Sequence, residues 1–323
     1  MSDLPKRVTI NEDGPREGFQ IESATIPTER KVELIDALSE TGIKEIQIAS
    51  FVHPKRVPQM ADAEEVVKQV KMKDGVRYTS LYLNDQGLKR ALATGRLHIE
   101  GAISLGASEA FLMRNQNTTP AQQIERRKEM VRSLQENGIA VTKGNVSAAF
   151  GCNFQGEIPL SKLLATFEDV FRIADELGIT LTAIGLSDTM AWATPARIKS
   201  AIGALRDKYP QVEISLHLHD TRGLAVANAY AGLEMGVTDF DGSIGGLGGC
   251  PFAAHKGAAG NLCTEDFAFM CEEMGIETGL DLDRLIEAAE LAERIVGHPL
   301  PGSVMRGGSL AALRRAVAQG AAA

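Results

Sequence analysis

The sequence predicts an α/β fold, a (β/α)8 barrel of the TIM type with helices appended at its C-terminal end. Short runs of β-branched residues alternate eight times with longer segments of helical period, which is the organisation of that barrel. Several helical segments end at glycine, which favours termination because glycine tolerates the left-handed conformation. The chain of 323 residues has the length of one such barrel with a short extension.

The predicted strands lie at 8–11, 44–49, 76–83, 98–104, 139–149, 179–186, 212–218 and 237–244. Helical patterns follow them, most clearly at 28–41, 120–137, 160–177 and 195–208. Two more amphipathic stretches, about 281–296 and 308–318, come after the eighth unit. We therefore divide the chain into a catalytic barrel, 1–280, and a helical extension, 281–323, packed on the barrel. The alternative is a doubly wound sheet, which would favour a G-x-G-x-x-G turn after the first strand, but residues 13–18 read DGPREG.

Composition and charge exclude several classes of function. The net charge of −8 is spread without a basic block, which argues against nucleic acid as a partner. The sequence has no run of about 18 apolar residues, so we expect no membrane span. The four cysteines are too few and too irregularly spaced for a disulfide framework, and the N-terminal segment does not resemble a targeting leader. We expect a cytoplasmic protein.

Polar and reactive residues follow several of the predicted strands, at the end where the active site of a barrel lies. They come after the first, second, sixth, seventh and eighth strands, and they are Arg16, Glu17, Gln47, Ser50, Asp188, His217, His219, Cys250 and, further on, Asn261. We therefore expect these side chains to share one rim of the barrel.

His217 and His219 are two residues apart on a predicted strand, so alternation places both imidazoles on one face. Together with a carboxylate such as Glu17 and an amide oxygen such as Asn261, they would make a mixed nitrogen and oxygen site. Such a site suits Mg²⁺ or Mn²⁺ and could also hold Zn²⁺ or Co²⁺. The alternative is that one or both histidines are hydrogen-bonded structural residues.

Three further residues are candidates for the chemistry, each with a structural alternative. Arg16 could stabilise a developing enolate oxygen, or form a structural ion pair with Glu17. Cys250 lies in a glycine-rich loop that could carry a reactive side chain over a substrate, although a lone cysteine is often a small buried hydrophobe. Asp188 could orient a histidine, accept a proton or bind a metal-bound water, or it could cap the helix that follows.

The sequence resembles the 3-hydroxy-3-methylglutaryl-CoA (HMG-CoA) lyase family over about residues 8–296. The matching motifs are GPREGFQ (14–20), ASFVHPKRVPQM (49–60), GASE (106–109), GCNFQG (151–156), LSDT (186–189), HLHDTRGLAVAN (217–228), GLGGCPF (246–252) and GAAGNLCTED (257–266). The last three segments are highly specific. The resemblance implies the barrel fold and a metal-dependent retro-Claisen cleavage of an acyl-CoA substrate.

Carried over by position, the resemblance implies four metal ligands, Glu17, His217, His219 and Asn261. It also implies that Arg16 neutralises the enolate of the departing acyl-CoA and that Cys250 supplies or accepts a proton. Asp188 and His217 would then exchange the proton of the substrate's 3-hydroxyl. We expect a homo-oligomer, either a dimer or a tetramer.

The sequence departs from the family pattern at the substrate mouth. Glu17 stands where the family usually has Asp, and Gln47 stands where it usually has Glu, which removes a negative charge. The cysteine loop is two residues longer, with His255 and Lys256 in the lengthened part. We therefore expect the protein to cleave a related ester, such as citramalyl-CoA or methylmalyl-CoA, at least as well as HMG-CoA. The residues expected to contact the substrate are Gln47, Ser50, His255 and Lys256.

Three other functions remain open at this point. A Claisen-type acyltransferase, such as an isopropylmalate or citramalate synthase, usually carries a C-terminal regulatory domain, for which the sequence has no room after about residue 296. An aldolase acting on 4-hydroxy-2-oxo acids would not need the cysteine loop. A catalytically silent barrel that binds only CoA or a metal would not need Arg16, both histidines and Cys250 together.

Overall fold

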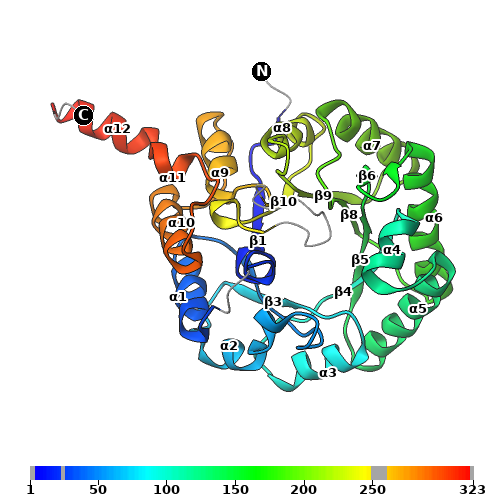
Figure 1. Ribbon diagram of the computed structural model, residues 1–323. Helices are drawn as coiled ribbons and strands as arrows, with labels where there is room; N and C mark the ends of the chain where they lie inside the picture. Colours follow the sequence, from blue (N-terminus) through cyan, green and yellow to red (C-terminus); the bar gives the residue numbers. More distant parts are fainter. Residues whose placement is uncertain (1–3, 23–25, 249–259, 321–323) are drawn as a thin grey trace.

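Eight parallel strands form the inner wall of a barrel in the computed structural model, which describes residues 4–22, 26–248 and 260–320 (Figure 1). The strands are β1 (Thr9–Glu12), β2 (Glu45–Ser50), β3 (Arg77–Leu81), β4 (Gly101–Gly106), β5 (Val141–Ser147), β8 (Ala183–Asp188), β9 (Glu213–Leu218) and β10 (Asp239–Gly242). Their order in the sheet is β3-β2-β1-β10-β9-β8-β5-β4. Across the seam between β3 and β4, His98 N–H donates to the carbonyl oxygen of Tyr78 at 2.8 Å.

Helices surround this wall on the outside (Figure 1). They are α1 (Thr28–Ser39), α2 (Ala63–Gln69), α3 (Asp85–Ala93), α4 (Glu109–Gln116), α5 (Pro120–Glu136), α6 (Leu160–Glu176), α7 (Pro195–Lys208), α8 (Ala225–Glu234) and α9 (Thr264–Glu273). The predicted barrel is confirmed, because each predicted strand coincides with one of the eight observed strands. In the described part of the chain, no helix is long and apolar enough to span a membrane.

The C-terminal segment adds three helices, α10 (Leu282–Val296), α11 (Val304–Gly307) and α12 (Leu310–Ala318). Helix α10 buries Leu285 and Ala289, and it packs beside α1 and α9 (Figure 1). Helix α12 projects from the body of the molecule, and none of its residues is buried. Val304 and Met305 of α11 are also buried, so the extension consists of two packed helices followed by the projecting helix α12.

The sequence analysis missed two short features that shape the mouth of the barrel. The strands β6 (Gly151–Cys152) and β7 (Gly156–Glu157) form a small antiparallel hairpin after β5. A single turn of π-helix, η1 (Gly14–Gly18), follows β1 and holds Arg16 and Glu17.

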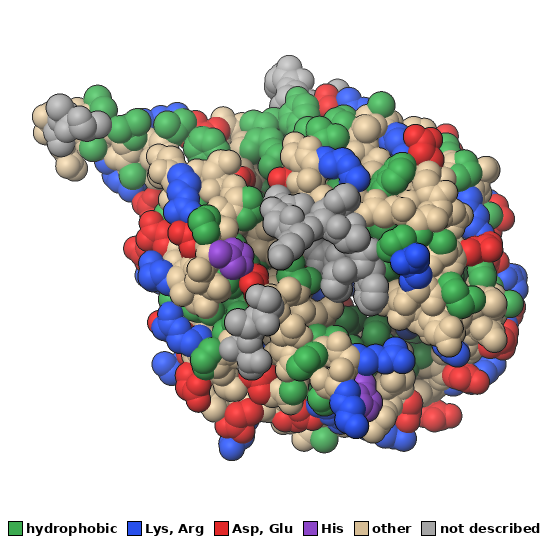
Figure 2. Space-filling model, viewed as in Figure 1, with side chains coloured by type: hydrophobic (Ala, Val, Ile, Leu, Met, Phe, Trp, Pro, Cys, Tyr) green, Lys and Arg blue, Asp and Glu red, His purple; other side chains and the backbone are tan. Residues whose placement is uncertain are grey.

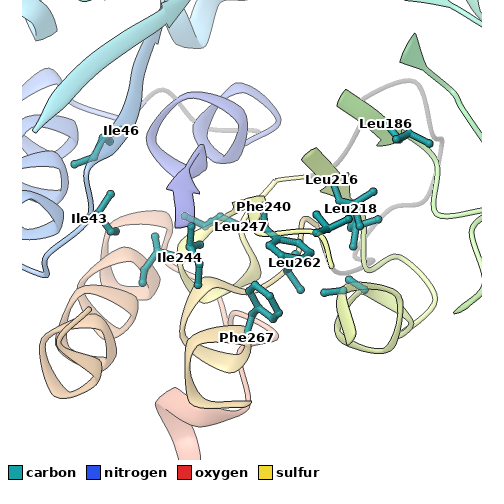
Figure 3. Packing of buried hydrophobic residues seen from close by; sticks show 14 of the residues in the cluster. Ile43, Ile46, Leu186, Leu216, Leu218, Phe240, Ile244, Leu247, Leu262 and Phe267 are labelled. Carbon is teal, nitrogen blue, oxygen red and sulfur yellow. The ribbon is translucent and has the colours of Figure 1, made fainter. Parts of the chain in front are cut away.

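Strand residues alternate between the outside and the inside of the barrel. Leu216, Leu218 and Phe240 are buried in the apolar layer between strands and helices, where the ring of Phe240 lies 4.7 Å from that of Phe267 (Figure 3). The strand residues next to these, such as His217 and Asp241, point to the other side and carry polar side chains. The barrel interior is accordingly polar, and it contains a cavity of about 550 Å³ that extends from the loop before β9 to Asp13 and Gln47.

Acidic and basic side chains are interspersed around the face of the barrel seen in Figure 2, and no single sign gathers there.

Candidate active site

Glu12, the last residue of β1, joins the segments from which the site is built. Its Oε1 accepts hydrogen bonds from Gly14 N at 2.8 Å and Ile244 N at 2.9 Å, and its Oε2 accepts from Thr264 Oγ1 at 2.6 Å. Gly14 begins the π-helical turn, Ile244 begins the 3-10 turn η3 (Ile244–Gly246), and Thr264 begins α9. Burial raises the pKa of Glu12 to about 8, although the three hydrogen bonds lower it.

Arg16 lies on the π-helical turn and is surrounded by oxygen acceptors. Its Nε donates to Gln47 Oε1, and its Nη2 lies 2.9 Å from Glu17 Oε2 and 3.4 Å from Asp13 Oδ2. Only 11% of the Arg16 side chain is exposed, so these contacts fix the direction of the guanidinium. The ion pair with Glu17 that the sequence left open as an alternative is present.

Asp13 is a site residue that the sequence analysis did not find. Burial and the neighbouring Asp241 raise its pKa to about 7, and the charges of Arg16 and His217 oppose that rise. Its position directly before the GPREG motif, at the end of the first strand, is the signal that could have identified it.

Glu17, His217 and His219 converge on one point. The two imidazole Nε2 atoms lie 3.1 Å apart. Glu17 Oε1 lies 3.2 Å from His219 Nε2, and Glu17 Oε2 lies 3.7 Å from His217 Nε2. The structure therefore brings together three of the four expected ligands, with one donor atom of each within the range that a single cation can bridge.

Asn261 completes this group through the backbone and through an unpaired side chain. It forms an isolated β-bridge with His219, and its side chain lies near Glu17 because both approach Gly248. Asn261 is 2% exposed, and among the residues that the structure describes neither Oδ1 nor Nδ2 has a hydrogen-bond partner. A buried amide without partners is costly, so this side chain fits a cation ligand whose contacts would satisfy its oxygen.

The charges of the group are mutually dependent. Burial would raise the pKa of Glu17, but the charges of Arg16 and His217 and the hydrogen bonds from both histidines hold it well below its usual range. Burial would lower the pKa of His217, but Glu17 and the hydrogen bond to Asp241 raise it well above the ordinary value. Without a cation the histidine thus supplies the positive charge that balances the carboxylates.

Asp188 and Ser50 lie at the expected ends of their strands. The Asp188 oxygens accept hydrogen bonds from Trp192 N at 2.8 Å and Ala193 N at 3.0 Å, and burial raises its pKa. The carboxylate therefore holds the turn before α7, whereas the N-cap of that helix is Thr194 and not Asp188. Ser50 is fully buried at the end of β2, and its Oγ has no hydrogen-bond partner within residues 4–22, 26–248 and 260–320.

Cys250, His255 and Lys256 lie outside the described residues. The described chain on either side of them is joined beside the site, because Gly260 N donates to Gly246 O at 3.1 Å and Asn261 N donates to Leu247 O at 3.3 Å. The base of the predicted loop therefore adjoins the Asn261 side chain.

Comparisons with known proteins agree with this arrangement. The HMGL-like family model matches residues 7–292. A hydroxymethylglutaryl-CoA lyase of Bacillus subtilis is 40% identical over 297 residues, which cover 92% of this chain and 96% of that protein. The human mitochondrial hydroxymethylglutaryl-CoA lyase is 39% identical over 288 residues, covering 89% of this chain and 85% of that one.

Solved structures give the same result. The crystal structure of the Bacillus subtilis HMG-CoA lyase superposes with a TM-score of 0.85 at 38% identity, covering 95% of this chain and 99% of that chain. An HMG-CoA lyase from A. baumannii, in complex with coenzyme A and 3-methylmalate, superposes with a TM-score of 0.84 at 35% identity and covers 96% and 97% of the two chains. With its barrel and its converging carboxylate and histidines, this chain belongs to the HMGL-like family of lyases.

Proposed function

We propose that the protein is a divalent-metal-dependent carbon–carbon lyase that cleaves a 3-hydroxyacyl-CoA. The observation that carries the proposal is the convergence of Glu17, His217 and His219 beside Arg16, in a chain 40% identical to a hydroxymethylglutaryl-CoA lyase. With 3-hydroxy-3-methylglutaryl-CoA as substrate, the products would be acetoacetate and acetyl-CoA. Glu17, His217, His219 and Asn261 would hold the cation, and Mg²⁺ or Mn²⁺ suits their mixed nitrogen and oxygen donors.

The bound cation would act as a Lewis acid that lowers the pKa of the substrate's 3-hydroxyl. A protein base removes the hydroxyl proton, the C2–C3 bond breaks, and its electron pair passes into the enolate of the departing thioester. The Arg16 guanidinium, fixed by Gln47 and Glu17, stabilises the enolate oxygen. The Cys250 thiol gives a proton to the enolate carbon, which completes the acyl-CoA product.

Asp188 is our candidate for the base. Its raised pKa favours proton uptake, and each carboxylate oxygen keeps a second lone pair beside the backbone hydrogen bond that it accepts. His217 has Nδ1 bonded to Asp241 and Nε2 directed at the ligand group. Both nitrogens are therefore engaged, and His217 contributes to catalysis as a ligand.

The test of this function is the formation of acetoacetate and acetyl-CoA from HMG-CoA, measured with and without a chelator. Activity should disappear on chelation and return with Mg²⁺ or Mn²⁺, and His219→Ala should bind the cation weakly while remaining folded. Full activity in metal-stripped protein would contradict the proposal.

The role of Cys250 can be tested separately with a second cysteine as control. Cys250→Ala should lower turnover by about 10²–10⁴-fold, the usual contribution of a general acid. Cys152 is fully buried in a small apolar cluster, so Cys152→Ala should lower stability and leave the chemistry intact. Equal turnover of Cys250→Ala and wild type would exclude the proposed role.

A second candidate substrate is a citramalyl-CoA or methylmalyl-CoA ester. It is favoured by the A. baumannii relative, which was crystallised with coenzyme A and 3-methylmalate. Gln47, Ser50, His255 and Lys256 would contact the half of the substrate that is not CoA. Measuring kcat/KM side by side decides between the two, and an advantage of HMG-CoA of more than about tenfold would exclude the second candidate.

We also propose a cytoplasmic homo-oligomer, either a dimer or a tetramer. Cys152, Cys263 and Cys271 are buried and free, as expected in a reducing compartment. Leu313 and Val317 of helix α12 are exposed. Figure 2 shows hydrophobic side chains on the projecting arm, which would offer a surface to a second copy. Light scattering of wild type and Leu313→Glu tests the assembly, and a wild-type monomer would contradict it.

A further inference from the structure

The Nδ1 atom of His217, which points away from the ligand group, faces two carboxylates. It lies 3.1 Å from Asp241 Oδ2 and 3.6 Å from Asp13 Oδ2. Only the first distance is that of a hydrogen bond. An ionised carboxylate can only accept, so Nδ1 carries the proton and donates it to Asp241.

This hydrogen bond determines which nitrogen of His217 can serve as a ligand. When Nδ1 holds the proton of a neutral imidazole, the lone pair remains on Nε2. Nε2 is the atom that faces Glu17 and His219. We infer that Asp241 is a positioning residue, which fixes the tautomer and ring orientation of His217 for binding the cation; this inference rests on the metal site of the proposed function.

The strand register places Asp241 for this role. On the sheet, Asp241 of β10 is paired with Asn11 of β1 on one side and with His217 of β9 on the other. Asn11 Nδ2 donates to Asp241 Oδ1 at 3.2 Å and to Asp239 Oδ1 at 2.9 Å. The three side chains thus form a row across adjacent strands, in which Asn11 orients Asp241 and Asp241 orients His217.

The second histidine has no such support. His219 Nδ1 is buried, and no residue in the described part of the chain makes a hydrogen bond to it. Orientation of the ligand pair therefore depends on His217, and loss of Asp241 should affect cation affinity strongly. A hydrogen-bonded carboxylate behind a metal-binding histidine typically changes metal affinity by about 10–100-fold.

Asp241 also lines the cavity of about 550 Å³ inside the barrel, together with Asn11 and Asp239. Removal of its side chain would leave additional space that opens into this cavity. A small carboxylate such as formate is small enough to enter and to accept the His217 Nδ1–H. The position is therefore suited to chemical rescue, which separates the hydrogen bond from a general effect of the substitution.

The experiment measures Mn²⁺ affinity of wild type, Asp241→Ala and Asp239→Ala by equilibrium dialysis. Asp239 is the matched control, because it lies on the same strand, lines the same cavity and binds Asn11 but makes no contact with His217. We expect about 10–100-fold weaker binding for Asp241→Ala, little change for Asp239→Ala, and recovery with formate for Asp241→Ala alone. Wild-type affinity in Asp241→Ala would overturn the inference, and so would equal losses in both variants without rescue.

The tautomer gives a second readout that a purely structural role would not change. With Mg²⁺ bound, the ¹⁵N shifts of His217 should show a protonated Nδ1 in wild type and a change in Asp241→Ala that formate reverses. If Asp241→Ala does not fold, Asp241→Leu keeps a similar volume and cannot accept the His217 Nδ1–H, so it should bind Mn²⁺ about 10–100-fold more weakly. Wild-type affinity and ¹⁵N shifts in that variant would overturn the inference. Failure of wild type itself to bind Mn²⁺ would instead refute the proposed metal site.

Discussion

Replacing Glu12 with glutamine should make the protein more stable at alkaline pH. The carboxyl group is fully buried and accepts hydrogen bonds from Gly14, Ile244 and Thr264. A glutamine reproduces the protonated acid, because its oxygen can accept both backbone N–H groups and its amide can donate to the Thr264 hydroxyl. The substitution therefore removes a titrating group while keeping the contacts that join the segments of the site.

The sign and size follow from the pKa. Burial raises the pKa of Glu12 from 4.5 to about 8 in the folded protein. Between these values the folded protein holds a proton that the unfolded chain releases, so the free energy of unfolding falls as pH rises. The slope is about 1.4 kcal/mol per pH unit, so the contribution of Glu12 lost between pH 5.5 and 7.5 is about 3 kcal/mol. This part of the stability is fully present below pH 4.5 and is lost as pH rises through about 8.

Urea unfolding of wild type and Glu12→Gln at several pH values measures this difference directly. The free energy of unfolding of the variant should gain on that of wild type by about 3 kcal/mol over those two pH units. Taking the difference between the two proteins cancels the other titrating groups. A difference that is constant with pH, or that grows in the opposite direction, would show that Glu12 is ionised in the folded protein.

Three further outcomes test the site. Cation affinity should fall as pH drops through the pKa of His217, which lies well above 6.5, because the cation must displace a proton from Nε2. Calorimetry in two buffers with different heats of ionisation measures the released proton. Gly248→Ala should weaken Mn²⁺ binding about tenfold, because an added Cβ at φ +100 would lie 3.0 Å from Asn261 Nδ2; equal affinity in dialysis would contradict this. Asp13→Asn should lower kcat/KM about tenfold, because it removes a carboxylate beside the Arg16 guanidinium. Adding Gln47→Glu to this variant should restore most of the lost kcat/KM. A double variant as slow as Asp13→Asn would refute the charge argument.

The sequence predicted the barrel well because its strands are buried and its helices amphipathic. Both patterns arise from packing against a single core, and that core is continuous in the structure. The hairpin of β6 and β7 was missed because two-residue strands carry no periodic signal. Its position depends on a distant contact, since a Cβ on Gly151 would lie 2.5 Å from the Trp192 ring.

The site was predicted only where it lies on the rim of the barrel. Alternation along one strand predicted that His217 and His219 share a face, and the structure brings their Nε2 atoms together with Glu17. Asp241 was missed because the search favoured residues at the ends of the strands, and Asp241 lies within the predicted strand 237–244. Alternation within β10 places it inside the barrel, where a lone carboxylate has few structural explanations. Asp13 follows the first strand and was passed over in favour of Arg16 and Glu17.

The role of Gln47 illustrates why contacts must be added to sequence patterns. In isolation, Gln47 suggests that the mouth of the barrel has lost a negative charge. In the structure, the guanidinium that Gln47 contacts also lies 3.4 Å from the carboxylate of Asp13, which comes from the neighbouring strand. A carboxyl group is therefore present beside Arg16, displaced from β2 to the end of β1. Burial and the neighbouring Asp241 raise its pKa to about 7, so it is only partly ionised at neutral pH. Since the position of the carboxyl group differs from the family pattern, the preference for one acyl group over another should depend on the direction of Arg16.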